Sequence, residues 1–224
     1  MTAQEVCARI QISEVLRYAG CRTIDEKMKS AAVMCIEEIS SVIRPRIVSK
    51  TCRIVHTPQG SLFDDTLLIP GNDLVRLLNG CEQAVLFAAT LSAQIDTYIR
   101  KAEILDMSHA LFLDSSATAA VEAACDLFEE EIKEQYPSMT LTMRYSPGYG
   151  DVPIGVQEAF LSFLDAPRKI GLCATASSIL TPRKSVTAII GLSKTAQPQK
   201  RRSCETCNLR ERCQFHQKGD FCGR

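Results

Sequence analysis

Apolar residues recur at helical spacing in several parts of the chain. One stripe runs from Met28 to Ile43 and is followed by Pro45, a residue that ends helices. A second stripe joins Val121 to Ile132 at positions i, i+3, i+4, i+7 and i+11. Further helices are predicted at residues 13–20, 74–78, 93–101, 107–113 and 155–164.

Polar residues beside these segments are typical of helix N-termini. Thr23 and Glu26 form a capping box ahead of the first stripe. Ser13, Asp73 and Ser92 stand where each can cap one of the shorter helices. These residues therefore predict where the helices begin.

Apolar and β-branched runs bounded by turn residues predict strands. The turn between the first two strands contains Pro58, Gly60 and Asp64. Helical and extended segments alternate along the chain, which favours an α+β domain with helices packed against a mostly antiparallel sheet. The predicted strands are residues 51–56, 66–69, 84–89, 170–175 and 186–191.

A tight turn is predicted where residues 144–153 read Arg-Tyr-Ser-Pro-Gly-Tyr-Gly-Asp-Val-Pro. Pro147 fixes its own φ, and Gly148 permits the positive φ that a type II turn requires after proline. We expect such a turn to leave backbone amides accessible to a partner.

The side chains around this turn favour a ligand that is part amino acid and part nucleoside. Arg144 carries a planar fork of donors suited to a carboxylate. Tyr145 and Tyr149 can stack on a heterocycle or face a sulfonium group. Glu122 and Asp126 lie one helical turn apart, beside the second apolar stripe. An ordinary surface turn with solvated charges is the alternative interpretation.

Composition narrows the function classes. Of the 224 residues, 46% are hydrophobic, which suits one large domain or one domain with a small appendage. The 26 basic and 26 acidic side chains cancel, so no net charge attracts nucleic acid or an anionic membrane. There is neither a Walker loop nor a Gly-x-Gly-x-x-Gly segment after a strand. No secretory signal or apolar run of about eighteen residues is present, so we expect a cytoplasmic protein.

The eleven cysteines fall into two groups. Four lie within residues 204–224 in the pattern Cys-x2-Cys-x5-Cys-x8-Cys, and they could together bind zinc or a 4Fe-4S cluster. His216 could also serve a zinc site, and a cysteine tail without metal is the remaining alternative. The four predicted metal ligands are Cys204, Cys207, Cys213 and Cys222. The other seven are predicted to be core thiols: Cys7, Cys21, Cys35, Cys52, Cys81, Cys125 and Cys173.

Residues 144–149 resemble the Arg-x-Ser/Ala-Pro-Gly-Tyr signature of the activation domain of cobalamin-dependent methionine synthase. Residues 119–132, 170–175 and 180–191 are similar to other segments of that family, in the same order. The resemblance is clearest over residues 85–192. Three segments depart from the family: Thr175-Ala176-Ser177 lacks its glutamate, Ala188-Ile189-Ile190 replaces its aromatic pair, and Asp151-Val152-Pro153 replaces Pro-x-Cys-Pro.

The resemblance implies a twisted α+β domain over residues 1–192. The cysteine spacing adds a linker at 193–203 and a metal-binding tail at 204–224. It implies that S-adenosylmethionine binds to the turn and to the preceding helix. Tyr149 would be the catalytic residue that orients the methyl donor. The implied ligand-binding residues are Glu122, Arg144, Tyr145, Ser146, Pro147, Gly148 and Tyr149.

The implied function is that of a stand-alone activation protein for a separate methionine synthase. It would support reductive methylation of cobalamin carried by that partner, with an electron donor of the flavodoxin or ferredoxin type. Because this reaction needs an electron, it favours a 4Fe-4S cluster over zinc in the tail. The alternatives are an activator of another corrinoid methyltransferase and a non-catalytic module that binds S-adenosylmethionine or docks a partner.

Overall fold

The computed structural model describes residues 1–21 and 25–195, which form an α+β fold. Six strands make one antiparallel sheet in the order β3-β2-β1-β4-β8-β5, and β6 and β7 pair separately. The strands are β1 (Arg46–Thr57), β2 (Gly60–Phe63), β3 (Leu67–Ile69), β4 (Gln83–Thr90), β5 (Thr140–Leu141), β6 (Cys173–Ala174), β7 (Leu180–Thr181) and β8 (Ser185–Ser193). The predicted fold class is confirmed for the domain.

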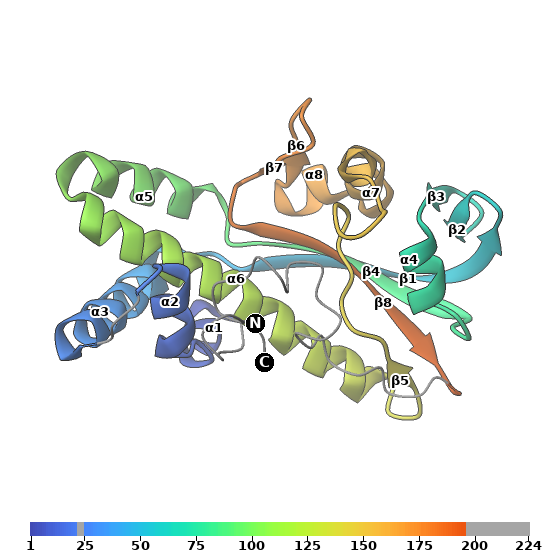
Figure 1. The fold of residues 1–224 in the computed structure, drawn as a ribbon, viewed down its shortest axis with the longest axis horizontal. Coiled ribbons are helices and arrows are strands. Elements are labelled where there is room, and N and C mark those ends of the chain that lie inside the picture. Colours follow the sequence, from blue (N-terminus) through green and yellow to red (C-terminus); the bar gives the residue numbers. More distant parts are fainter. Residues whose placement is uncertain (22–24, 196–224) are drawn as a thin grey trace.

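Helices cover both faces of the large sheet. In Figure 1, the sheet lies between α6 on one side and α7 with α8 on the other. The helices are α1 (Ala3–Ala8), α2 (Ile12–Tyr18), α3 (Glu26–Val42), α4 (Asn72–Leu77), α5 (Ala93–Leu105), α6 (Met107–Gln135), α7 (Gln157–Leu164) and α8 (Ala166–Ile170), with a 3-10 turn at Ile154–Val156 before α7.

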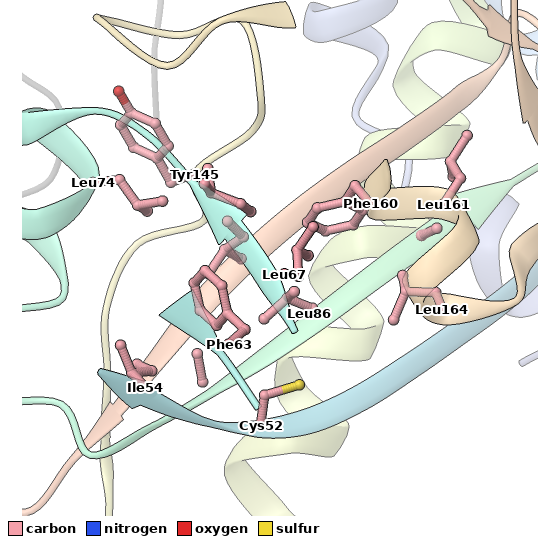
Figure 2. Close-up of a cluster of buried hydrophobic side chains, with 14 of the residues drawn as sticks. Cys52, Ile54, Phe63, Leu67, Leu74, Leu86, Tyr145, Phe160, Leu161 and Leu164 are labelled. Atoms are coloured by element: carbon pink, nitrogen blue, oxygen red, sulfur yellow. The ribbon is translucent and has the colours of Figure 1, made fainter. Parts of the chain in front are cut away.

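Neighbouring residues of β4 face opposite sides of the sheet, as the pleat of a strand requires. Val85 and Phe87 pack into a core with Cys125 of α6. Leu86 packs into a different core with Phe160 of α7. Figure 2 shows this second core, which also receives side chains from β1, β2, β3 and α4. The two faces of the sheet therefore pack into two separate apolar cores.

The 29-residue helix α6 organises the rest of the molecule. It joins two segments that the sequence predicts as separate helices. Buried alanines on more than one of its sides, such as Ala117 and Ala119, allow close packing. Helices α1, α2, α3 and α5 all contact it. None of the described helices is long and apolar enough to cross a membrane.

Strand prediction succeeded in the sheet centre, but it missed the short strands β2, β5 and β7 and extended β6 at both ends. β4 and β8 match the predicted segments, and β1 begins before the predicted one. The predicted turn at residues 58–64 contains β2, whose Ser61 and Leu62 pair with β1. The strand predicted at residues 170–175 is confirmed only at Cys173–Ala174, which form β6, because the short helix α8 extends to Ile170 and Gly171 ends it at a φ of 70°.

Several predicted caps are also wrong. Asp25 caps α3 by accepting a hydrogen bond from Met28 N (2.7 Å), and Thr23 lies outside the described residues. Ser13 lies inside α2 and Asp73 inside α4. Ser92 occupies the N-cap position of α5 as predicted, but its hydroxyl donates to Leu91 O and Gln94 Oε1 and makes no capping bond. Helices α2 and α4 begin earlier than predicted, after Gln11 and Gly71, and neither of these residues makes a side-chain capping bond.

The cysteine prediction is confirmed for Cys35, Cys52, Cys81 and Cys125, which are buried. It is wrong for Cys173, which is exposed in the short strand β6. Cys7 and Cys21 are partly buried. The predicted ligands Cys204, Cys207, Cys213 and Cys222 lie outside the described residues, as does the linker from residue 196.

Candidate functional site

The chain between β5 and the predicted turn runs along the edge of the sheet beside β8. Thr142 N donates to Gly191 O (3.0 Å), and Tyr145 N donates to Ile189 O (3.0 Å). Ile189 N returns a hydrogen bond to Tyr145 O (2.9 Å). This pairing fixes residues 144 and 145 at the sheet edge. Their side chains consequently point to opposite faces.

Arg144 lies on the α6 face, where three carboxylates surround its guanidinium group. Its Nη1 donates to Asp126 Oδ1 (2.7 Å) and Glu129 Oε2 (3.4 Å), and its Nη2 donates to Glu122 Oε2 (3.1 Å). Glu122, Asp126 and Glu129 share one face of α6 because they are spaced at i, i+4 and i+7. We call these four residues the Arg144 cluster.

The Arg144 cluster is partly open to solvent. Arg144, Asp126 and Glu129 are between 21% and 24% exposed, and Glu122 is 39% exposed. Three carboxylates around one guanidinium leave an excess of negative charge. Burial raises the pKa of Glu129, although Arg144 and then Lys133 oppose the shift. The cluster therefore suits a ligand that brings both signs of charge with positive charge in excess.

Tyr145 belongs to the core on the opposite face. It is 8% exposed and packs in the cluster drawn in Figure 2, near Leu74. Its hydroxyl donates to Tyr149 O (2.9 Å), and the two tyrosine rings meet edge to face with their centroids 6.4 Å apart. Tyr145 thus anchors the turn that follows it. Tyr149 is 50% exposed at the end of that turn.

The predicted type II turn is confirmed at Ser146–Pro147–Gly148–Tyr149. Gly148 has a φ of 93°, and Tyr149 N donates to Ser146 O (3.2 Å). The expectation of accessible amides is wrong for two positions, because Gly148 N also donates within the loop, to Val152 O (3.0 Å). The turn closes on itself, and this internal bonding makes it a rigid support.

Asp151 ties the loop to α4. Its carboxylate accepts hydrogen bonds from Asn72 N (2.6 Å) and Asp73 N (3.0 Å), and the Asp73 bond is the main cause of its lowered pKa. Gly150, at a φ of 54°, lies so close that an added Cβ would sit 2.2 Å from Asp73 Oδ2 and 2.5 Å from Tyr145 Oη. Only glycine fits there without displacing a neighbour.

No protein-family model and no curated protein matches the chain. Among solved structures, a crystal structure of the MetH reactivation domain bound to AdoHcy is similar. The match has a TM-score of 0.69 and covers 89% of this chain and 78% of that chain, at 14% sequence identity. The chain therefore has an activation-domain-like fold.

Within this activation-domain-like fold, the predicted site residues divide between the two faces of the sheet. Glu122 and Arg144 come together on the α6 face. Tyr145 lies in the opposite core, while Ser146, Pro147, Gly148 and Tyr149 form the turn beside it. Tyr149 presents an exposed ring. The predicted site residues therefore do not all lie on one face of the sheet.

Glu129 was missed as a site residue, and Asp126 was noted only as a neighbour of Glu122. Their spacing from Glu122 was the available signal, because i, i+4 and i+7 positions share a helix face. The approach of Tyr18 of α2 to Glu122 was also not predicted. Burial first, and then the nearby Glu122 carboxylate, raises the pKa of Tyr18. No sequence pattern indicated that α2 approaches this part of α6.

Proposed function

We propose that this protein binds S-adenosylmethionine at the Arg144 cluster and supports reductive methylation of cobalamin on a separate methionine synthase. The observation that carries the proposal is the guanidinium of Arg144 held among Glu122, Asp126 and Glu129 at a partly exposed edge. The activation-domain-like fold supports the same function, since the similar reactivation domain was solved with AdoHcy bound.

The donor set fits the charges of S-adenosylmethionine. The ligand has a carboxylate, an ammonium and a sulfonium, so it carries one net positive charge. Arg144 offers its fork to the carboxylate, and the surrounding acids attract the two cationic groups. Glu122 is the most exposed acid of the cluster. We therefore propose that Glu122 leaves its ion pair with Arg144 and pairs with the ligand ammonium instead.

The turn at residues 146–149 would form the wall of the ligand site next to the Arg144 cluster. Ser146, Pro147 and Gly148 form a rigid support, and Tyr145 holds it through its hydroxyl bond to Tyr149 O. Tyr149 is 50% exposed, and its ring would contact the ligand and orient the methyl donor. The methyl group on a positively charged sulfur supplies the electrophile, and the protein's own contribution is positioning.

The partner in this proposal is a cobalamin-binding methionine synthase or another corrinoid protein. The tail would supply an electron through a 4Fe-4S cluster held by Cys204, Cys207, Cys213 and Cys222, with zinc as the alternative metal. An electron donor of the flavodoxin or ferredoxin type would deliver that electron to the cluster, which would pass it to the corrinoid. These parts of the proposal rest on the sequence, because the tail lies outside the described residues.

Calorimetric titration of anaerobically purified protein with S-adenosylmethionine tests the binding step. Arg144→Met removes the fork, and the loss of charge-assisted hydrogen bonds should weaken binding by about 10- to 100-fold. Arg53→Met is the matched control, since Arg53 is an exposed arginine of β1 that pairs with Asp65. Equal affinity in wild type and Arg144→Met, with both folded by circular dichroism, would remove the Arg144 cluster from the proposal.

Methylation of cob(II)alamin on a corrinoid partner tests the activation step. Transfer of labelled methyl from S-adenosylmethionine to the corrinoid, dependent on this protein and on a reductant, supports the proposed function. Tight ligand binding without any stimulation of methyl transfer would instead favour the non-catalytic binding module. A response with a corrinoid protein of O- or N-demethylation, but not with methionine synthase, would identify the other activator.

A further inference from the structure

A second group of chemistry-bearing side chains lies where α3, α5 and α6 meet. Cys35 and Glu38 are one turn apart on α3, and His109 is in the first turn of α6. One potential ligand atom from each residue lies within 4.8 Å of the other two. This group is roughly 20 Å along α6 from Glu122, at 1.5 Å per residue. The proposed binding of S-adenosylmethionine uses none of these residues.

Glu38 is held so that its two oxygens face different partners. Tyr98 of α5 donates its hydroxyl to Glu38 Oε1. The other oxygen, Oε2, lies 2.8 Å from His109 Nε2. The carboxylate is thereby oriented from one side and directed at the imidazole from the other. Cys35 is 2% exposed and completes the group from the buried side.

The elements that carry the group are fixed in place. Asp106 caps α6 by accepting hydrogen bonds from Ser108 N (2.9 Å) and His109 N (3.2 Å). Ile95 and Ile99 of α5 are buried in the same apolar core as Cys35. Rigid helices on three sides keep the three ligand atoms together, which limits the entropy lost on binding an ion.

We propose that Cys35, Glu38 and His109 form a zinc site with a fourth position for solvent. A thiolate, a carboxylate and an imidazole are all zinc ligands, and the two anions balance the charge of the ion. Tetrahedral zinc with bonds of about 2.0 to 2.3 Å spaces its ligand atoms about 3 to 4 Å apart, so small side-chain rotations suffice. The side chains of His109 and Glu38 are 40% and 30% exposed, which gives the ion a route from solvent.

Binding exchanges a proton for the metal and transfers no electron. The S–H bond of Cys35 breaks, its proton passes to solvent, and a sulfur–zinc bond forms. His109 Nε2 gives up its 2.8 Å contact with Glu38 Oε2, and its proton moves through solvent to Nδ1, so that the neutral imidazole binds zinc through Nε2. The Tyr98 hydroxyl keeps its hydrogen bond to Glu38 Oε1 and so orients the carboxylate from outside the coordination shell.

Metal titration of the full chain tests the site once the tail cysteines are silenced. The background variant carries Cys204→Ser, Cys207→Ser, Cys213→Ser and Cys222→Ser. It is stripped of metal and titrated with Zn²⁺ against a competing chelator, and then with Co²⁺ as a spectroscopic probe. We expect one equivalent of either ion to bind and Co²⁺ to show a thiolate charge-transfer band in the near ultraviolet.

Single changes in this background assign the ligands. Cys35→Ser should abolish the charge-transfer band and weaken zinc binding by more than tenfold. Tyr98→Phe should keep the band and weaken zinc binding by about 10- to 100-fold, as expected for a residue that orients a ligand. Cys52→Ser is the control, because Cys52 is a buried thiol of the other core and should leave zinc binding unchanged.

Two results would overturn the proposal. One is a folded background variant that takes up no zinc at equimolar metal. The other is zinc uptake and a cobalt band that survive Cys35→Ser. If Cys35→Ser does not fold by circular dichroism, Glu38→Gln provides the same test, since it keeps the side-chain shape and removes the anionic ligand. Undiminished zinc affinity in Glu38→Gln would equally contradict the site.

Discussion

The two faces of the large sheet differ in what they contribute, although consecutive residues of one loop reach both. On the α6 face, Arg144 meets three carboxylates at a partly exposed edge. On the opposite face, Tyr145 and Val152 are buried with the side chains of α4 and α7. This contrast between the faces indicates that the Tyr-Ser-Pro-Gly-Tyr residues of the loop mainly hold its backbone in place. The charged chemistry comes from one arginine and from a helix earlier in the chain.

The largest expected effect is on stability, at Tyr145. Replacing this buried ring by alanine leaves a cavity and frees the turn, so Tyr145→Ala should lower the free energy of unfolding by about 3 to 5 kcal/mol. Urea denaturation measures the change. Tyr149→Ala is the matched variant, because Tyr149 is half exposed, and it should cost far less. Equal losses in the two variants would contradict the assignment of Tyr145 to the supporting face.

Gly150 should show the next largest effect. Alanine there adds a Cβ beside Asp73 and Tyr145 at a positive φ, so Gly150→Ala should destabilise the fold by about 2 kcal/mol. Gly155→Ala is the control, since an added Cβ at Gly155 meets nothing within 4 Å. Thermal unfolding of both variants makes the measurement. A Gly150→Ala protein as stable as the Gly155→Ala protein would show that the loop is not held as described.

A smaller effect is expected on ligand selectivity from the charged face. S-adenosylmethionine and S-adenosylhomocysteine share the carboxylate and the ammonium, so the ratio of their affinities isolates the sulfonium charge. Removing one nearby negative charge with Asp126→Asn should lower the preference for S-adenosylmethionine by about threefold. Competition titration of the two ligands measures the ratio. A preference that rises in Asp126→Asn would mean that the cluster does not attract the sulfonium.

The smallest effect concerns pH and Glu129. Burial raises its folded pKa above the ordinary value of 4.5, with Arg144 opposing. Stability from this group is therefore present below the unfolded pKa and is lost as pH rises through the raised folded pKa. Glu129→Gln should avoid that loss, gaining less than about 1 kcal/mol at neutral pH and nothing in acid. Melting temperatures of wild type and Glu129→Gln, measured from acid to neutral pH, give the difference in stability. A variant less stable than wild type at pH 7 would reverse the assigned sign.

The long periodic elements could be predicted from the sequence because each satisfies its pattern locally. The apolar stripes gave α3 and the second half of α6, and continuous apolar runs gave β4 and β8. The strand β2 was missed because its few residues lie in a run that reads as a turn. Its pairing with β1 stabilises it instead.

The candidate site could be predicted only in part. Resemblance pointed to Arg144 and Glu122, which the structure brings together. The opposite orientation of Tyr145 depends on its pairing with Ile189, a residue more than forty positions later in the chain. The role of Asp151 depends on α4 in the same way. Such non-local contacts leave no periodic signal in the sequence.

A crystal structure of the protein with S-adenosylmethionine tests the central claim most directly. We expect the ligand carboxylate to lie within hydrogen-bond distance of the Arg144 guanidinium, on the α6 face, with Glu122 turned toward the ligand ammonium. Tyr145 should remain buried and bonded to Tyr149 O. A ligand bound elsewhere, with Arg144 still enclosed by Glu122, Asp126 and Glu129, would contradict the account.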